Sequence, residues 1–280
     1  LTKLHVIDRC HVILEIFAGH ARTKEAKIQI EMARLNYILP RLIGFWTHFS
    51  RQKGGVGIRG GEGEQQIELD RRIVRKKIAV LKRELKEIKK SRKQQGKLRK
   101  SKVLTAALVG YTNAGKSSIM NRLCNVNVLE ENKLFATLDS TYRTLSPNTK
   151  PPLILIDTVG FLSNLPNTLI DGFKTTLESA SEADLLVIIC DISNPNYEKQ
   201  LEVTHEVLKE LGLENKETIL VFNKKDLVKD AFKEKIVKKI YPESFLVSSF
   251  NKNDMKNLKE FIVNSVLKKL DHFDLFIPYE

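Results

Sequence analysis

Two kinds of hydrophobic pattern follow one another along the chain, and the change comes near residue 103. In the first part, apolar residues recur at steps of four and three over two separate stretches. This spacing is typical of helices that pack on a partner helix, and two short stretches predict an antiparallel helical hairpin. Pro40 lies inside the first stretch and should kink it, because proline cannot donate the helical hydrogen bond. The apolar positions are Ile28, Met32, Leu35, Leu39, Leu42 and Trp46, and then Val74, Ile78, Leu81, Leu85 and Ile88.

Shorter patterns flank and interrupt this hairpin. Val6–Ile7 and Val12–Phe17 are predicted as two short strands that end an N-terminal α/β region. Glycine makes up half of the residues from Lys53 to Glu64, so this segment is predicted to be an irregular hairpin tip. It serves either as a flexible linker or as a surface that fits closely against RNA or nucleotide. Residues 91–102 are basic and polar and are predicted as a linker, with Gly96 breaking the helix.

From residue 103 onward, short apolar runs alternate with amphipathic stretches. Strands that are buried on both faces of a sheet have near-continuous Val, Ile and Leu sequences. The alternation therefore predicts an α/β fold, with a mostly parallel sheet covered by helices on both faces. The predicted strands are Leu104–Val109, Leu153–Ile156, Leu185–Ile189, Thr218–Phe222 and Phe245–Val247, and the predicted helices include Leu201–Leu211 and Leu258–Leu270.

The clearest chemical motif directly follows the first predicted strand. Gly110–Ser117 fits the pattern GxxxxGK[ST] and lies between a strand and a helix, as that motif requires. Its backbone N–H groups are expected to surround phosphates, with Lys116 on the β- and γ-phosphates and the Ser117 hydroxyl on Mg²⁺. The residues of this loop predicted to contact nucleotide are Gly110, Asn113, Ala114, Gly115, Lys116, Ser117 and Ser118.

A second motif, Asp157-Thr158-Val159-Gly160, follows the next predicted strand. Asp157 is expected to reach Mg²⁺ through water, and the Gly160 N–H to contact the γ-phosphate. Between the two motifs, Thr137 is the candidate switch threonine for both Mg²⁺ and the γ-phosphate, with Thr141 as the alternative. The predicted catalytic residues are thus Lys116, Thr137 and Gly160, and the predicted metal ligands are Ser117, Thr137 and Asp157.

A third motif concerns the choice of base. Asn223-Lys224-Lys225-Asp226 follows the fourth predicted strand. Asp226 can accept two hydrogen bonds from guanine, whereas adenine has no such donor pair and would leave the carboxylate unpaired. Lys224 is expected to lie along the base plane and Asn223 to tie the loops together. Ser248-Ser249-Phe250 ends the last strand, where the Ser249 N–H can approach guanine O6. Together the motifs predict GTP and GDP as ligands.

These motifs, in this order and spacing, resemble the translation-factor class of P-loop GTPases. The chain as a whole resembles the HflX family, which are ribosome-associated GTPases of bacteria and organelles. Segments that carry this similarity are Val6–Arg9, Ile13–Phe17, Ala21–Glu25, Leu39–Leu42, His48–Gln52, Gln66–Glu68, Asp70–Arg72, Gly110–Ser118, Phe135–Asp139 and Asp157–Phe161.

The resemblance implies a domain order. Residues 1–22 correspond to the end of an N-terminal α/β subdomain, and residues 23–102 to a basic helical hairpin with a glycine-rich tip. Residues 103–270 correspond to a P-loop GTPase domain, a three-layer sandwich, and residues 271–280 to the start of a C-terminal segment. The resemblance further implies that the chain is a fragment, and that it binds the large ribosomal subunit near its catalytic centre and splits or rescues ribosomes.

Two departures from the family pattern affect these expectations. The tip reads Arg59-Gly60-Gly61-Glu62-Gly63-Glu64-Gln65 and lacks the proline that is usual in the family. The family's usual Ser-Ala-Lys is replaced by Ser248-Ser249-Phe250, which should lower guanine affinity modestly. In addition, Phe161 occupies the position where many GTPases have a water-orienting glutamine, so hydrolysis should be slow without a partner.

The distribution of charge favours RNA as that partner. Residues 1–102 contain 26 Lys and Arg against 10 Asp and Glu, a net charge of +16. The whole chain has a net charge of +13, so the remaining residues have a net charge of −3. Such a concentration attracts a polyanion. A GTPase switch acting on an anionic membrane or a protein partner through the same basic arm is the alternative. A non-hydrolytic RNA-binding assembly factor and, less favoured, an ATP-dependent remodelling enzyme are further alternatives.

The cysteine content and the lengths of the apolar runs indicate the cellular compartment. Cys10, Cys124 and Cys190 are odd in number and widely spaced, which is typical of a reducing compartment. The sequence contains no apolar run near the ~18 residues of a membrane span and no signal-peptide pattern. A cytoplasmic monomer without stable membrane association is therefore predicted.

Overall fold

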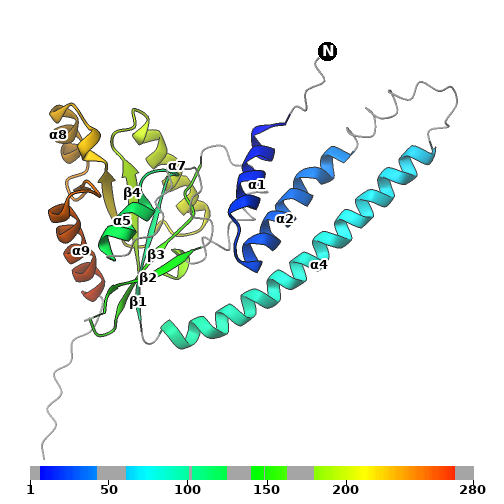
Figure 1. Ribbon diagram of the computed structural model, residues 1–280, viewed down its shortest axis with the longest axis horizontal. Helices are drawn as coiled ribbons and strands as arrows, with labels where there is room; N and C mark the ends of the chain where they lie inside the picture. Colours follow the sequence, from blue (N-terminus) through cyan, green and yellow to red (C-terminus); the bar gives the residue numbers. More distant parts are fainter. Residues whose placement is uncertain are drawn as a thin grey trace, which may run out of the picture. The chain divides into compact units, whose positions relative to one another are not determined.

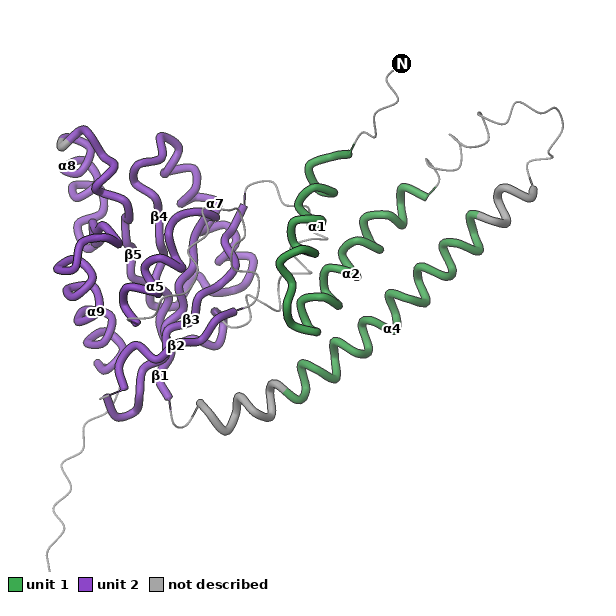
Figure 2. Tube along the Cα trace, in the orientation of Figure 1, with its two compact units in different colours: residues 1–98, 164–175 green, residues 99–163, 176–280 purple. Residues whose placement is uncertain are grey.

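The computed structural model describes residues 7–42, 61–100, 103–124, 140–147, 149–162 and 180–268. The chain divides into two compact units (Figure 2). Residues 1–98 with 164–175 form the first, here called the helical unit, and residues 99–163 with 176–280 form the second, the nucleotide unit. In the described parts, the helical unit consists of helices and the nucleotide unit contains the sheet.

Local capping determines where the first helices of the helical unit begin. The Asp8 side chain accepts a hydrogen bond from the His11 N–H at 2.9 Å, and Thr23 accepts one from the Ala26 N–H at 3.1 Å. The α-helix that contains the first apolar stretch ends before Pro40, which lies in a short 3₁₀ turn, as a helix-breaking proline requires. The elements are α1 (Arg9–His20), α2 (Lys24–Ile38), η1 (Leu39–Arg41) and α4 (Gly61–Lys100), coloured blue to cyan in Figure 1.

Two ion pairs show that α2 and α4 run antiparallel. Lys24 pairs with Glu84 at 3.8 Å, and Glu31 pairs with Lys77 at 2.5 Å. Seven residues forward along α2 therefore correspond to seven residues backward along α4. The predicted apolar stripe of α4 is the inner face, since Ile78 is buried and the other four stripe residues are partly buried. The helical hairpin predicted from the sequence is confirmed, although Trp46 lies outside the described residues.

The prediction of a strand at Val12–Phe17 is wrong. This run lies within α1, where Ile13, Leu14 and Phe17 are buried. A short apolar run is compatible with either a strand or a buried helix, and periodicity alone does not separate them. The Asp8 cap was the local signal for a helix. Of the other predicted strand, Ile7 is described and is not in a strand, and Val6 lies outside the described residues.

The predicted linker at residues 91–102 is also wrong for most of its length. Helix α4 passes through Gly96 and ends at Lys100. One glycine costs a helix interior only about 1 kcal/mol, which a helix of this length can absorb. The irregular tip predicted for Lys53–Glu64 is likewise too long, since α4 begins at Gly61. Residues 53–60 lie outside the described residues.

The nucleotide unit is built on a six-stranded sheet in the order β2-β3-β1-β4-β5-β6. All neighbouring strands are parallel except β2, which pairs with β3 antiparallel at the edge. The five strands predicted from apolar runs are present. β2 was missed because only Leu145 in it is buried, so it has no apolar run. The strands are β1 (Leu104–Gly110), β2 (Thr141–Ser146), β3 (Leu153–Asp157), β4 (Leu185–Asp191), β5 (Thr218–Asn223) and β6 (Phe245–Leu246).

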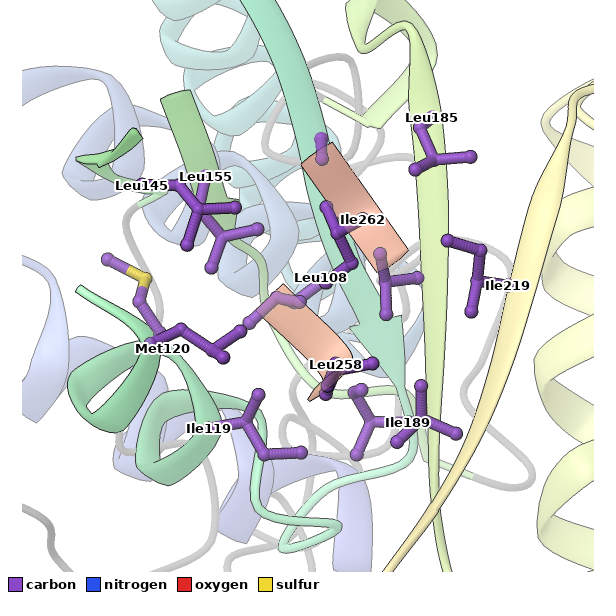
Figure 3. Packing of buried hydrophobic residues seen from close by; sticks show 14 of the residues in the cluster. Leu108, Ile119, Met120, Leu145, Leu155, Leu185, Ile189, Ile219, Leu258 and Ile262 are labelled. Atoms are coloured by element: carbon purple, nitrogen blue, oxygen red, sulfur yellow. The ribbon is translucent and has the colours of Figure 1, made fainter. Parts of the chain in front are cut away.

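Helices cover both faces of this sheet and make it a three-layer sandwich. On one face, apolar residues of α5 and α9 pack against the strands, including Ile119, Leu258 and Ile262 (Figure 3). On the other face, residues of α7 and α8 form a second core around Phe222 and Leu201. The helices are α5 (Lys116–Leu123), α7 (Tyr197–Glu210), α8 (Ala231–Ile240) and α9 (Lys252–Leu267), with a 3₁₀ turn η2 (Lys225–Leu227).

The sheet topology brings the predicted motifs to one edge. Because β1, β3, β4 and β5 are parallel, their carboxyl ends lie at the same edge, where ligands bind in open α/β sheets. Gly110, Asp157 and Asn223 are the last residues of three of these strands. In the described part of the chain, no helix combines the length and the hydropathy needed to cross a membrane.

Candidate nucleotide-binding site

The loop after β1 adopts a backbone conformation that depends on glycine. Gly110 has φ +143° and Gly115 has φ +94°, a region that side chains rarely adopt. A Cβ on Gly110 would lie 2.2 Å from the Ile189 carbonyl oxygen, and one on Gly115 would lie 2.2 Å from Asn223 Nδ2. Asn113 also has a positive φ, +61°. The loop is therefore a tight cradle whose backbone cannot accept a side chain at either glycine.

Lys116 opens α5 and turns back into this loop. Its Nζ donates to the carbonyl oxygens of Gly110 at 3.1 Å and Tyr111 at 2.9 Å. The side chain is 6% exposed, and its burial lowers the pKa of the ammonium to about 8, while the nearby Asp157 carboxylate opposes that shift. At neutral pH the loop thus holds a concentrated positive charge, which suits a phosphate.

Ser117 and Asp157 form a hydrogen-bonded pair of oxygen-bearing side chains beside that charge. The Ser117 hydroxyl donates to Asp157 Oδ2 at 2.6 Å, and Asp157 is buried at the end of β3. A hydroxyl beside a carboxylate is the ligand chemistry of Mg²⁺, which commonly binds one or two protein oxygens together with phosphates and water. Among the described residues, no three His, Cys, Asp or Glu side chains cluster as metal ligands, so a site that relied on protein carboxylates alone is not seen there.

The segment that follows Asp157 lies directly against the phosphate loop. A Cβ on Gly160 would be 2.7 Å from Thr112 Cα and 2.8 Å from Lys116 Nζ. The Phe161 N–H donates to the Gly110 oxygen at 3.0 Å, and the Thr112 N–H donates to the Phe161 oxygen at 2.8 Å. The Phe161 side chain is buried in the core formed with α7. Only glycine fits at residue 160, which places its backbone next to the lysine ammonium.

Asn223 joins the phosphate loop to the predicted base-recognition loops. Its Nδ2 donates to the Ala114 oxygen at 3.0 Å, and its Oδ1 accepts from the Ser249 N–H at 3.2 Å. The side chain is 1% exposed. Three segments that are far apart in sequence are therefore connected through one amide. In this structure the Ser249 N–H is directed at Asn223, and its contact with guanine O6 stays a prediction.

The rest of the third motif forms the outer part of the site. Lys224 has φ +63°, and its Nζ pairs with Asp191 Oδ2 at 2.8 Å. Asp226 is exposed in η2, where its carboxylate is accessible to a ligand. Ser248 and Ser249 are buried, whereas Phe250 is 70% exposed with the Arg122 guanidinium 5.7 Å from its ring centroid.

Three predicted residues need separate mention. Thr137 lies outside the described residues. Thr141, the alternative to it, is the first residue of β2 and pairs with Asp157 across the sheet. Ser118 is partly buried on α5, one residue beyond the Ser117 hydroxyl. The structure thus brings the described motif residues to one site, and leaves the choice of switch threonine as a prediction.

The sequence motifs did not predict two acidic residues of this site, Asp191 and Asp254. Asp191 ends β4, where it accepts hydrogen bonds from Ser193 N and Oγ at 3.0 and 2.5 Å in addition to pairing with Lys224. Asp254 lies in the first turn of α9 and contacts both Lys225 and Ser248. A position directly after an apolar run was a usable signal for Asp191. No local pattern identifies Asp254, because its partners come from other segments.

Comparison with known proteins agrees with this geometry. A family model described as "50S ribosome-binding GTPase" matches residues 105–224, and one described as "GTP-binding GTPase Middle Region" matches residues 20–99. A crystal structure of a GTP-binding protein from Sulfolobus solfataricus in complex with GDP is similar with a TM-score of 0.58 and 26% identity, covering 94% of this chain and 73% of that one. The nucleotide unit therefore has the fold of a P-loop GTPase, a class that binds guanine nucleotides.

Sequence relatives narrow the class to a family. GTPase HflX of Magnetococcus marinus is 48% identical over 222 residues, which are 79% of this chain and 51% of that protein. GTPase HflX of Gluconacetobacter diazotrophicus is 42% identical over 278 residues, 99% of this chain and 60% of that protein. The chain belongs to the HflX family of GTPases. It spans between about half and two thirds of the length of these curated relatives.

Proposed function

We propose that the protein binds GTP and GDP together with Mg²⁺, hydrolyses GTP slowly by itself, and acts on the large ribosomal subunit through its basic helical unit. The single observation that carries the proposal is the buried polar network at the sheet edge. In it, Lys116, Ser117–Asp157 and Asn223 connect a phosphate loop, a metal-ligand pair and a base-recognition loop.

The phosphate end supports binding of a triphosphate with a metal ion. The Lys116 ammonium, stripped of water by burial, interacts with phosphate charge more strongly than an exposed lysine does. Ser117 and Asp157 would hold Mg²⁺, which neutralises charge on the β- and γ-phosphates when it is bound. Gly160 lies against Lys116, so its N–H is suited to sensing the γ-phosphate. Thr137 is proposed as the remaining ligand from the switch segment.

The side chain of Phe161 supports slow hydrolysis in the absence of a partner. It follows Gly160, where other GTPases use glutamine to orient the attacking water. Here the side chain is apolar and packs in the core of the nucleotide unit. A phenyl ring cannot orient water by a hydrogen bond. A partner that orders the switch segments or supplies a catalytic group is therefore expected to accelerate hydrolysis.

The exposed face of α4 supports RNA as the partner. Arg72, Lys76 and Arg83 are exposed there, at spacings of four and seven residues that place them on one side of the helix. The inner face of the same helix is the apolar stripe around Ile78. Phosphate contacts by such a row give affinity through counterion release. The HflX relatives and the description "50S ribosome-binding" favour ribosomal RNA over other polyanions.

The decisive experiment is GTP hydrolysis titrated with large ribosomal subunits over a range of salt concentrations. We expect slow turnover alone, strong acceleration by subunits, and loss of that acceleration as salt rises. Small subunits and anionic liposomes are the matched controls. Equal turnover with and without large subunits, or acceleration by liposomes alone, would contradict the ribosomal assignment.

The three free cysteines and the family point to a reducing cytoplasm as the place of action.

A further inference from the structure

Asp254 forms a link between two segments at the base end of the site. Both of its carboxylate oxygens contact Lys225 Nζ, Oδ1 at 2.8 Å and Oδ2 at 2.7 Å. Oδ2 also accepts a hydrogen bond from the Ser248 N–H at 2.8 Å. The side chain of Asp254 is 15% exposed, so these contacts are largely shielded from water. One carboxylate thus binds a cation from one loop and a backbone N–H from another.

Both partners of Asp254 belong to the predicted base-recognition loops. Lys225 lies between Lys224 and Asp226, and its own N–H donates to the Val247 oxygen at 3.2 Å. Ser248 directly follows Val247 and precedes Ser249, whose N–H bonds Asn223. The segment from Ser248 to Phe250 is therefore held from two sides, by the Asn223 amide and by the Asp254 carboxylate.

We propose that Asp254 is a positioning residue for guanine selectivity, which acts by holding the Ser248–Phe250 segment in register with Asn223–Asp226. The proposal rests on the proposed nucleotide-binding function and adds a residue to it. Asp254 itself does not touch the base. It keeps the backbone that faces the 6-oxo side of guanine at a constant distance from the Asp226 carboxylate on the other side.

The chemistry of the link explains why a carboxylate is effective there. Hydrogen bonds between ionised groups, and from backbone N–H groups to a carboxylate, are about twice as strong as neutral ones. Asp254 also lies in the first turn of α9, where the helix dipole favours a negative charge. An isolated surface ion pair contributes little. Asp254 differs from such a pair because it is shielded and because its second partner is a backbone group that cannot move away.

The test compares nucleotides that differ only on the 6-oxo side. Dissociation constants are measured for GDP and for 6-thioguanosine 5′-diphosphate, which keeps the N1–H and 2-amino donors but has sulfur, a weaker hydrogen-bond acceptor, in place of the 6-oxo oxygen, with the chain and its Asp254→Ala variant. We expect GDP affinity to fall about tenfold and affinity for the analogue to change less than about twofold, since the lost contact is a charge-assisted hydrogen bond. Asp254→Asn, whose amide oxygen can still accept from Ser248, should lie between the two proteins.

The control is Glu260→Gln, which neutralises an exposed carboxylate on the same helix and should change neither constant. Thermal unfolding of each variant checks that α9 remains folded. If Asp254→Ala does not fold, Asp254→Asn and Lys225→Met form the test as a double-mutant cycle. Lys225→Met should then lower GDP affinity less in the Asp254→Asn background than in the unchanged chain, since both substitutions weaken the same Lys225–Asp254 ion pair.

The outcomes separate this proposal from the function on which it rests. Equal losses for GDP and the analogue would show that Asp254 only stabilises α9, and the proposal would fail. Unchanged GDP affinity in Asp254→Ala, or additive effects in the cycle, would also overturn it. If the unchanged chain itself showed no preference for GDP over ADP, the guanine-binding function would fail, and this proposal with it.

Discussion

Most of the buried polar side chains lie in the nucleotide unit, whereas the ion pairs of the helical unit lie at its surface. In the helical unit, the ion pair between Lys24 and Glu84 joins side chains that are 76% and 45% exposed. In the nucleotide unit, Thr158 is fully buried and donates to the Leu108 oxygen at 2.7 Å, and Asn223 is almost fully buried. Exposed ion pairs contribute about 0–1 kcal/mol each, whereas a buried polar group that loses its partner costs about 1–3 kcal/mol.

This difference teaches how each unit can be altered. Single substitutions at the sheet edge of the nucleotide unit should have large effects, because Lys116, Asp157 and Asn223 are buried and hydrogen-bonded to defined partners. In the helical unit, single charges should be nearly dispensable, and the sum of charge on one face should matter. The predictions below test that contrast, from the largest expected effect to the smallest.

The largest effect is expected for Asp226→Asn. The amide presents a donor where guanine also presents donors, so the preference for GDP over ADP should fall by roughly 1000-fold. Calorimetric titration with both nucleotides measures the preference. Asp230→Asn is the control, because that carboxylate caps α8 through the Phe232 N–H at 2.8 Å and lies outside the motif. An unchanged preference in Asp226→Asn would remove the basis for assigning guanine.

Gly115→Ala should lower affinity for every nucleotide by roughly 100-fold, through backbone strain and collision with Asn223. The added Cβ would lie 2.2 Å from Asn223 Nδ2 at a φ of +94°. Gly212→Ala is matched to it, since Gly212 has φ +69° but no atom within 4 Å of an added Cβ. That control should lose about 1 kcal/mol of stability and no nucleotide affinity. Equal nucleotide affinity in the two variants would mean that the Asn223 contact is unimportant.

Combined neutralisation is needed to affect the helical unit. Changing Arg72, Lys76 and Arg83 to glutamine should weaken binding to ribosomal RNA about tenfold and reduce the salt dependence by roughly two to three ions. GDP affinity should not change. Filter binding across salt concentrations measures both quantities. The matched control, Lys229, Lys235 and Lys239 to glutamine, removes the same charge from exposed sites of the nucleotide unit. If both triple variants behave alike, total charge and not the α4 face determines binding.

The smallest effect is expected for proton uptake when GDP binds at high pH. Burial lowers the pKa of Lys116 to about 8 from the ordinary 10.5, so the amine is mostly neutral at pH 8.5 to 9. A bound phosphate restores the charge, so GDP binding in that range should take up a proton, roughly one at most. Calorimetry in buffers of different ionisation enthalpy measures the uptake, and Lys116→Met should abolish it.

Because the unfolded chain binds more protons at Lys116 than the folded chain does between pH 8 and 10.5, Lys116 also makes the free energy of unfolding rise with pH in that window.

The sequence predicted most of the nucleotide unit because its signals are local. Apolar runs identified β1 and β3 to β6, and motif spacing identified the loops that follow three of them. Edge strand β2 was missed because one of its faces meets solvent and only Leu145 is buried. In the helical unit the hairpin prediction is confirmed, but the sequence pattern predicts a strand where α1 forms and a linker where α4 continues to Lys100. A short apolar run and a single glycine are ambiguous until packing determines the outcome.

By itself, the sequence identified the phosphate-loop motif, the motif that contains Asp157, the base motif and the asymmetric charge, because each depends on residues that are close together in the chain or on composition. Only the tertiary structure decided that Asp191 holds Lys224, that Asp254 joins Lys225 to Ser248, and that Asn223 spans three loops. Those contacts connect residues up to 109 positions apart. A hydrogen bond depends on distance in space, and that distance is defined only once the parallel strands have brought their carboxyl ends to one edge.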